Sequence, residues 1–236
     1  MNELELLARE AARKYGLDPR LICALCKVES SWIPTAQRHE AGYGCLIGFT
    51  RAPLDGNPTN EMRFTDANSY TWRADTKKLA KFGGVVIGDR ATILTELLNQ
   101  QTSVGLMQFM FATARERGLQ GRFAELFDPA VNLEWGCRHL RWMIDHNNAY
   151  GLPDPYRPTK PEDLAAAWNG GKARLERCPI CGGCGQSQKP HRYTISSEFP
   201  VVKDTQRTCE YCHGTGKAYV NEDYVKRVRK AMVNYE

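Results

Sequence analysis

The chain lacks any apolar run close to the roughly 20 residues needed to span a bilayer. It also lacks a basic start followed by an unbroken apolar core, because its first ten residues are acidic and amphipathic. No internal repeat is apparent apart from a pair of cysteine motifs. These absences argue against a membrane-spanning, secreted or repeat protein, and they predict a soluble chain made in the cytoplasm.

An even set of cysteines, typical of a secreted disulfide framework, is also missing. The chain has nine cysteines, and five of them crowd between Cys178 and Cys212. In a reducing compartment such a cluster favours metal ligation over disulfides. The formal net charge of +5 suits a polyanionic partner but is only a mild bias. With 236 residues, 42% of them hydrophobic, we expect one domain with a proper core and an accessory module.

The first candidate for chemistry is an acid near the end of a short predicted helix. Asp18 suits the N-cap and Pro19 the first helical position, and Pro34 is expected to stop the helix a turn after Trp32. Glu29 shares its predicted face with three apolar residues, Ile22, Leu25 and Cys26. Burial and the negative end of the helix dipole both disfavour a charged carboxylate there. Such an acid can serve as a general acid, and the alternative is a partly buried Glu paired with Lys or Arg.

Helical periodicity also appears elsewhere along the chain. We expect helices over residues 3–15, 112–117, 129–146, 162–168 and 222–235, with weaker signals at 75–81 and 90–100. Residues 35–102 are otherwise rich in Gly, Pro, Asn and aromatic residues, too long for an ordinary loop. We interpret residues 39–102 as an insertion that shapes one wall of a cleft.

Four short segments follow one another in a characteristic order. They are Glu29-Ser30-Ser31-Trp32, Gly105-Leu106-Met107-Gln108, Ala166-Ala167-Trp168-Asn169-Gly170-Gly171 and Tyr224-Val225-Lys226-Arg227-Val228. In this order, with a helix ending on the Glu, they resemble the catalytic domain of soluble lytic transglycosylases, relatives of goose-type lysozyme. The resemblance covers roughly residues 3–38, 103–172 and 220–235, and implies a mainly α, lysozyme-like fold of the α+β kind.

The resemblance also implies a role for individual residues. Glu29 matches the single catalytic acid, which protonates the oxygen of the β-1,4 bond between N-acetylmuramic acid and N-acetylglucosamine. It then takes a proton from the sugar's own 6-hydroxyl as a 1,6-anhydro ring closes. Met107 and Gln108 match cleft residues bordering the acid, Asn169 an Asn that contacts the substrate or the acid, and Tyr224 a tyrosine beside the acid. Structural alternatives are that Gln108 caps its own helix, Asn169 ends a helix and Tyr224 is core.

Two departures from the family pattern leave alternatives open. About 70 residues separate the acid motif from Gly105, where the family has a short link, and Trp168 stands where a tyrosine is usual. A hydrolase of the muramidase type would need a second carboxylate. The insertion offers four candidates: Glu40, Asp55, Glu61 and Asp66. Glu40 is nearest to Glu29 in sequence, and its plainer interpretation is a surface acid paired with Arg38.

Two cysteine motifs of the form C-x-x-C-x-G-x-G begin at Cys178 and Cys209. Two such knuckles can complete a tetrahedral zinc site through Cys178, Cys181, Cys209 and Cys212. A closed set of four thiolates leaves no position for water, so the zinc is expected to be structural. The paired motif resembles the cysteine-rich zinc repeats of DnaJ-type chaperones. Cys184 and His213 are spare and could each replace a ligand, whereas Cys23, Cys26, Cys45 and Cys137 look like buried or free thiols.

These patterns predict a lysozyme-like domain over residues 1–172 and 217–236, interrupted by a zinc module at 173–216. The leading hypothesis is a monomeric peptidoglycan lytic transglycosylase with no stable nucleic-acid partner. Without a signal peptide it fits a bacteriophage endolysin that waits in the host cytoplasm, or a wall-degrading enzyme carried in the virion. The alternatives are a muramidase using Glu29 with an insertion carboxylate, and a non-catalytic zinc protein that binds nucleic acid or unfolded protein.

Overall fold

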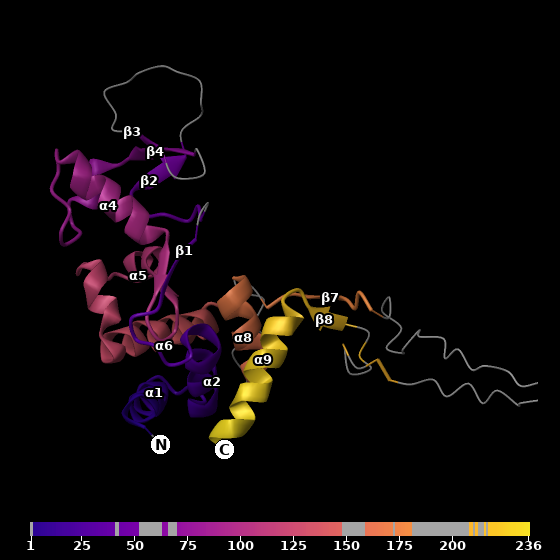
Figure 1. The fold of residues 1–236 in the computed structure, drawn as a ribbon. Helices are drawn as coiled ribbons and strands as arrows, with labels where there is room; N and C mark the ends of the chain where they lie inside the picture. Colours follow the sequence, from indigo (N-terminus) through magenta and orange to yellow (C-terminus); the bar gives the residue numbers. More distant parts are fainter. Residues whose placement is uncertain are drawn as a thin grey trace, which may run out of the picture. The chain divides into compact units, whose positions relative to one another are not determined.

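The chain is seen in a computed structural model that describes residues 2–40, 43–51, 63–65, 70–147, 159–171, 173–180, 208–209, 211, 215 and 217–236 (Figure 1). The chain forms two compact units, one of residues 1–145 with 228–236 and the other of residues 146–227. Both carry helices and short antiparallel strands, so the mainly helical fold class is confirmed. Within the described ranges, no helix is long and apolar enough to cross a membrane.

The helices of the first unit lie close to their predicted positions. Their bounds are α1 Glu3–Lys14, α2 Pro19–Ser30, α3 Thr76–Leu79, α4 Arg90–Gln100, α5 Phe111–Glu116 and α6 Pro129–Asp145, with 3-10 turns η1 Phe123–Phe127 and η2 Val233–Tyr235. Helix α1 packs against α2 and α6, and η2 packs against α2. Ala8 and Ala12 of α1 have no exposed surface, so their small side chains let α1 lie close to its neighbours.

The core of these helices is apolar and tightly enclosed. In α2 every residue from Leu21 to Cys26 has no exposed surface, and α6 contributes Leu133, Cys137 and Leu140 to the same interior. Burial raises the pKa of the Cys23 thiol to about 11 and holds that of Cys26 well above its ordinary value. These thiols therefore stay protonated, as expected of cysteines that pack as small apolar side chains.

A small antiparallel sheet closes the gap created by the insertion. Its strands run in the order β1 (Gln37–His39), β5 (Thr102–Val104) and β6 (Phe109–Met110). Arg38 of β1 lies opposite Ser103 of β5, which in turn lies opposite Met110 of β6. Because β1 follows α2 and β5 precedes the Gly-Leu-Met-Gln motif, this pairing joins the two motifs across the intervening chain.

The insertion is more regular than its composition suggests. Three strands in the order β2 (Phe49–Arg51), β4 (Thr71–Ala74) and β3 (Arg63–Thr65) form a second antiparallel sheet. One face of this sheet is buried with side chains of α3 and α4 in one cluster that includes Phe49, Phe64, Trp72, Leu79, Ile93 and Leu97. The period-two alternation of strands turns Arg73, which neighbours the buried Trp72, to the exposed face.

The second unit contains helix α8 (Pro161–Gly170), a ribbon of strands β7 (Leu175–Arg177) and β8 (Lys217–Tyr219), and the first residues of α9 (Glu222–Met232). Helix α8 begins at Pro161, one residue before the predicted start, since proline suits the first helical turn. Glu176 lies opposite Ala218 in the ribbon, which brings together the two ends of the predicted zinc module. The α-helical part of α9 stops at Met232, three residues short of the predicted end, and continues as the 3-10 turn η2.

Candidate active site and cysteine module

Glu29 lies in the last turn of α2 and is half-buried. The helix starts as predicted: the Asp18 side chain accepts from the backbone N–H of Arg20 at 2.9 Å, and Pro19 follows it. The predicted stop at Pro34 is wrong, because the helix already ends at Ser30, where Ser31 and Trp32 take left-handed conformations with φ of 53° and 68°. A left-handed residue commonly ends a helix, so local backbone geometry places the acid.

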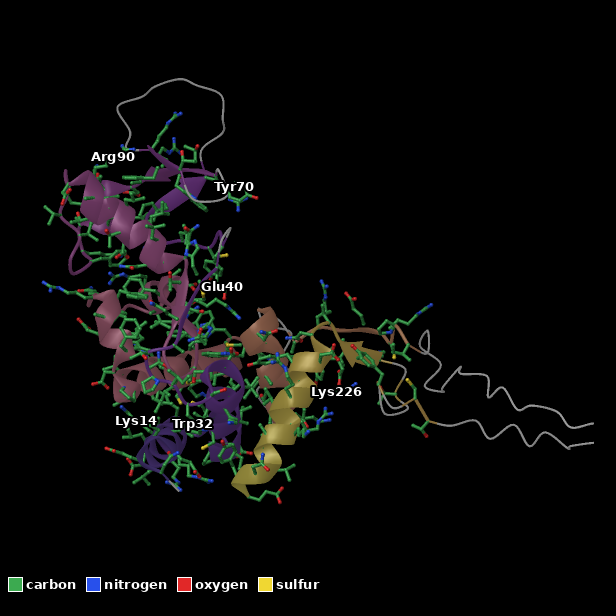
Figure 2. All side chains as sticks on the ribbon, viewed as in Figure 1. Lys14, Trp32, Glu40, Tyr70, Arg90 and Lys226 are labelled. Carbon is green, nitrogen blue, oxygen red and sulfur yellow. The ribbon has the colours of Figure 1, made fainter. Side chains whose placement is uncertain are left out.

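Ser30 attaches this helix end to the Gly-Leu-Met-Gln turn. Its hydroxyl is buried and lies 2.8 Å from the carbonyl oxygen of Leu106, with the Cys26 carbonyl oxygen at 3.0 Å. On the other side, Trp32, labelled in Figure 2, donates from its indole N–H to the Tyr235 hydroxyl at 3.0 Å, and the two rings meet edge to face. The residues flanking Glu29 are therefore held both by the turn and by the C-terminal end of the chain.

Gln108 closes the turn with a strained backbone and a fully engaged side chain. Its φ of 46° is rare for a residue other than glycine. The side-chain amide donates to the carbonyl oxygens of Ala36 and Gly105, each at 3.0 Å, and accepts from the Ser103 hydroxyl at 3.2 Å. Gln108 therefore fixes the turn against the segment that follows α2, and its contact with substrate stays a prediction.

Met107 does not line a surface, because it has no exposed area. A Cβ atom on Gly136 of α6 would lie 2.3 Å from the Met107 sulfur, so the thioether fills the space that this glycine leaves. The side chain therefore lies beneath the turn, and the expected role of Met107 as a cleft residue that borders the acid stays a prediction. Any effect of Met107 on substrate would be transmitted through packing.

Asn132 supports the turn from below and was not predicted as a site residue. It is fully buried in α6, accepts from the Met107 N–H at 2.9 Å and donates to the carbonyl oxygens of Val104 and Leu126 at 2.8 and 3.1 Å. Gly105 has a φ of 79°, and a Cβ there would lie 2.2 Å from the Asn132 side-chain nitrogen. In the sequence, the only sign of this supporting role is that Asn132, a polar residue, lies beside the apolar face of the predicted helix.

A buried ion pair lies behind the turn and was also missed. Arg115 of α5 meets both carboxylate oxygens of Glu96 of α4, at 2.8 and 2.9 Å, and the two side chains are 0% and 4% exposed. Arg115 also donates to the carbonyl oxygens of Leu119 and Gly121, and Gln100 donates to Glu96 at 2.9 Å. Because Glu96 is so completely engaged, its role is structural.

The second-carboxylate candidates of the muramidase hypothesis divide into two groups. Glu40 is paired with Arg38 at 2.5 Å, and its backbone N–H donates to the Gln101 carbonyl oxygen at 2.7 Å. This is the plainer interpretation that the sequence offered for Glu40. Asp55, Glu61 and Asp66 lie outside the described residues.

Asn169 and Tyr224 belong to the second unit. Asn169 is exposed near the end of α8, and its side-chain oxygen accepts from Asn221 at 3.1 Å, while Asn221 also donates to the Ala166 carbonyl oxygen. Tyr224 is 5% exposed, and the Arg227 guanidinium lies 5.5 Å from its ring centre. The predicted contacts of both residues with the substrate or the acid stay predictions.

Cys178 and Cys209, the first residues of the two motifs, are brought together at the β7–β8 ribbon. Both are buried, and their sulfur atoms lie 3.9 Å apart. A disulfide needs about 2.05 Å, whereas two thiolates on one tetrahedral zinc, at about 2.3 Å from it, are about 3.8 Å apart. The spacing therefore fits two ligands of a shared metal. Cys181, Cys212, Cys184 and His213 lie outside the described residues.

A second contact links this pair to the last helix. Tyr211, between the two cysteines of the second motif, packs on the Cys178–Cys209 cluster, and the Lys226 ammonium lies 3.8 Å from the centre of its ring. Lys226 lies on α9, two residues after Tyr224 (Figure 2). Among the residues that the structure describes, no group of three metal-binding side chains is found.

Comparison with known proteins bears on one part of the chain. Residues 89–178 match the family model of the Transglycosylase SLT domain. The matched segment includes Met107, Gln108, Asn169 and Cys178, starts after Glu29 and stops before Tyr224. No curated protein and no solved structure matches the chain. The match supports the lysozyme-like family and, in general terms, an enzyme of the peptidoglycan lytic transglycosylase type.

Proposed function

We propose that this chain is a peptidoglycan lytic transglycosylase whose single catalytic residue is Glu29. The observation that carries the proposal is the contact between Ser30 and the Leu106 carbonyl oxygen at 2.8 Å. It joins the end of α2, which lies outside the matched segment, to the Gly-Leu-Met-Gln turn inside it. The acid motif and the part of the matched segment that ends at residue 145 therefore belong to one local structure within the first unit.

In the proposed reaction Glu29 acts first as acid and then as base. The protonated carboxyl gives its proton to the glycosidic oxygen as the bond between that oxygen and the anomeric carbon breaks. The carboxylate then takes the proton of the muramic acid 6-hydroxyl. At the same time the oxygen of that hydroxyl bonds to the anomeric carbon. No water is consumed, and the acid returns to its starting state. The first step needs the protonated carboxyl, and Glu29 lies half-buried in the last turn of α2.

The remaining predicted residues have supporting roles in this proposal. Gln108 holds the turn beside the acid through its three hydrogen bonds, and Asn169 offers an amide for the acetamido and hydroxyl groups of the sugar. Tyr224 is proposed to orient the carboxyl of Glu29 through its hydroxyl group. Peptidoglycan glycan strands are the proposed partner, and a monomer is the proposed state.

We also propose that Cys178, Cys181, Cys209 and Cys212 hold one structural zinc ion. The 3.9 Å spacing and burial of Cys178 and Cys209 support a shared metal. When bound, zinc would supply cross-linking rather than chemistry on the substrate, because four thiolates fill its coordination. The ring of Tyr211 then gives the module a fixed contact with Lys226 of α9.

Mass spectrometry of muropeptides released from purified sacculi tests the reaction. A transglycosylase gives products lighter by one water than those of a lysozyme. Glu29→Gln should abolish release, whereas Glu40→Gln, the matched control acid, should leave both rate and product unchanged. Products that carry the added water, together with loss of activity in Glu40→Gln, would instead establish the muramidase alternative.

The biological setting is a further part of the proposal. A wall-degrading enzyme of this kind suits bacteriophage-mediated host lysis, either released from the host cytoplasm or carried in the virion. Expression in a bacterial host with and without a co-expressed holin tests this setting, and lysis should require both proteins. Steeply salt-dependent DNA binding without any wall cleavage would favour the non-catalytic zinc protein instead.

A further inference from the structure

A basic groove lies in the insertion, apart from the acid and its turn. It has a volume of about 780 Å³ and is lined by the segment 46–50, by the end of β4 and by α3 with the turn after it. Four cations border it, Arg73, Lys77, Lys78 and Lys81, and all four are exposed. Among the described residues that line the groove, the one acid is Asp75, which caps α3 through the Lys78 N–H at 3.1 Å and lies 3.7 Å from the Lys78 ammonium. The groove therefore carries a clear excess of positive charge.

The floor of the groove is built by close packing. A Cβ atom on Gly48 would lie 2.6 Å from the Leu79 side chain, so α3 rests directly on the backbone at Gly48, whose φ is 79°. The Asp75 N–H also donates to the Gly48 carbonyl oxygen at 2.8 Å. These contacts hold the three lysines of α3 and its following turn in a fixed relation to Arg73.

A chain of polar contacts connects the groove to the structure behind the candidate active site. Ile47, in the lining, donates its N–H to Gln100 at 2.7 Å and accepts from the same amide at 2.9 Å. Gln100 in turn donates to Glu96, which is paired with Arg115. Groove and turn belong to one unit, so an anchored ligand would be presented to the acid from a defined point.

We propose that this groove binds the carboxylates of the peptide stems of peptidoglycan. The inference rests on the proposed function, which makes the same polymer the substrate. The groove suits a carboxylate better than a neutral sugar, because it offers several cations, and Phe49, the one aromatic residue among its described lining residues, is only 4% exposed. Stems recur along each glycan strand, so stem binding would raise the local concentration of glycosidic bonds near Glu29.

The test compares two forms of one substrate. Sacculi are first treated with hydrofluoric acid to remove phosphate-containing polymers, and one half is then amidated with carbodiimide and ammonium to neutralise free carboxylates. Binding is measured by co-sedimentation of chains carrying Glu29→Gln, and turnover by muropeptide release from chains with intact Glu29. The groove variant is Lys77→Gln/Lys78→Gln/Lys81→Gln. The matched control, Arg13→Gln/Lys160→Gln/Lys230→Gln, removes three exposed cations elsewhere.

On sacculi whose carboxylates are free, we expect the groove variant to bind about tenfold more weakly than the parent, which corresponds to about 1.4 kcal/mol. On amidated sacculi the groove variant should bind like the parent. The control variant should bind both forms like the parent. Equal binding by groove variant and parent, or a loss that persists after amidation, overturns the inference. Failure of the intact enzyme to release muropeptides refutes the proposed function separately, because co-sedimentation still reports on the groove.

Discussion

The turn beside Glu29 and the cysteine module are held in place by different physical means. At the turn, Val104, Leu106 and Met107 have no exposed surface, and Asn132 satisfies the backbone groups buried with them. At the module, the described residues provide a cluster of only Cys178, Cys209 and Ala218, with Tyr211 packed against it, and all of β7 is exposed. Apolar burial is enough for the first region, whereas the second is the region that the proposed zinc would cross-link.

The largest expected effect is on the module. Cys209→Ser should remove a zinc ligand, so that metal content falls from about one zinc per chain to nearly none. Metal analysis measures this, and hydrogen exchange should show faster exchange in β7 and β8 with little change at residues 102–110. Cys45→Ser is the control, since Cys45 is an exposed free thiol. Equal loss of protection at the turn would contradict the distinction between the two regions.

The next effect concerns the buried pair behind the turn. Arg115→Met leaves Glu96 charged and unpaired in the interior, which should lower the free energy of unfolding by about 3–5 kcal/mol. Urea denaturation measures the loss. Adding Glu96→Leu to Arg115→Met should restore about half of the lost free energy of unfolding. The buried charge is then removed, but the Leu119 and Gly121 carbonyls remain without their donor. A double variant no more stable than the single one would show that packing, rather than the unpaired charge, is responsible.

Two glycines with positive φ provide a matched comparison within the first unit. Gly105→Ala places a Cβ 2.2 Å from the Asn132 side chain and 2.8 Å from the Leu126 carbonyl oxygen, so about 3 kcal/mol of stability should be lost. Gly16→Ala meets no atom within 4 Å, and only the left-handed backbone should matter, at about 1 kcal/mol. Thermal unfolding separates the two. Equal losses would mean that the turn can shift to accommodate a side chain.

The smallest effect is at a surface contact between α1 and α6. Burial alone would raise the pKa of Glu134, but hydrogen bonds from Lys14 and Tyr15 outweigh it and lower that pKa below its ordinary value near 4.5. The contact therefore stabilises the fold above pH 4.5 and is lost as the pH falls through the lowered pKa. Because Lys14 and Glu134 are 62% and 36% exposed, Lys14→Met should remove only a few tenths of a kcal/mol at pH 7.

Denaturation of Lys14→Met and the parent at several pH values measures this difference. It should shrink in strong salt and vanish in acid, where Glu134 is protonated. A difference that stays constant with pH would assign the effect to the packing of the Lys14 side chain rather than to its charge.

Features that depend on neighbouring residues could be predicted from the sequence. The start of α2 at Asp18 and Pro19 and the span of α4 over Arg90–Gln100 match the expectations, because capping chemistry and helical periodicity are local. The end of α2 was placed too late, because Ser31 and Trp32 take left-handed conformations that residues other than glycine rarely adopt. The sheet β2–β4–β3 was not predicted, since its strands have only three or four residues each and β2 pairs with β4 rather than with β3, its neighbour in the chain.

The residue types available for the chemistry can be read from the amino-acid order alone: an acid at a helix end, a Gly-Leu-Met-Gln turn and two paired cysteine motifs. Which of them meet, and what each one does, depends on how the chain folds. In the folded chain Met107 is buried, Gln108 is hydrogen-bonded within the turn, and Asn132 and the Glu96–Arg115 pair support that turn. The reason is that burial and hydrogen-bond partners come from segments distant in the chain, and no local pattern encodes them.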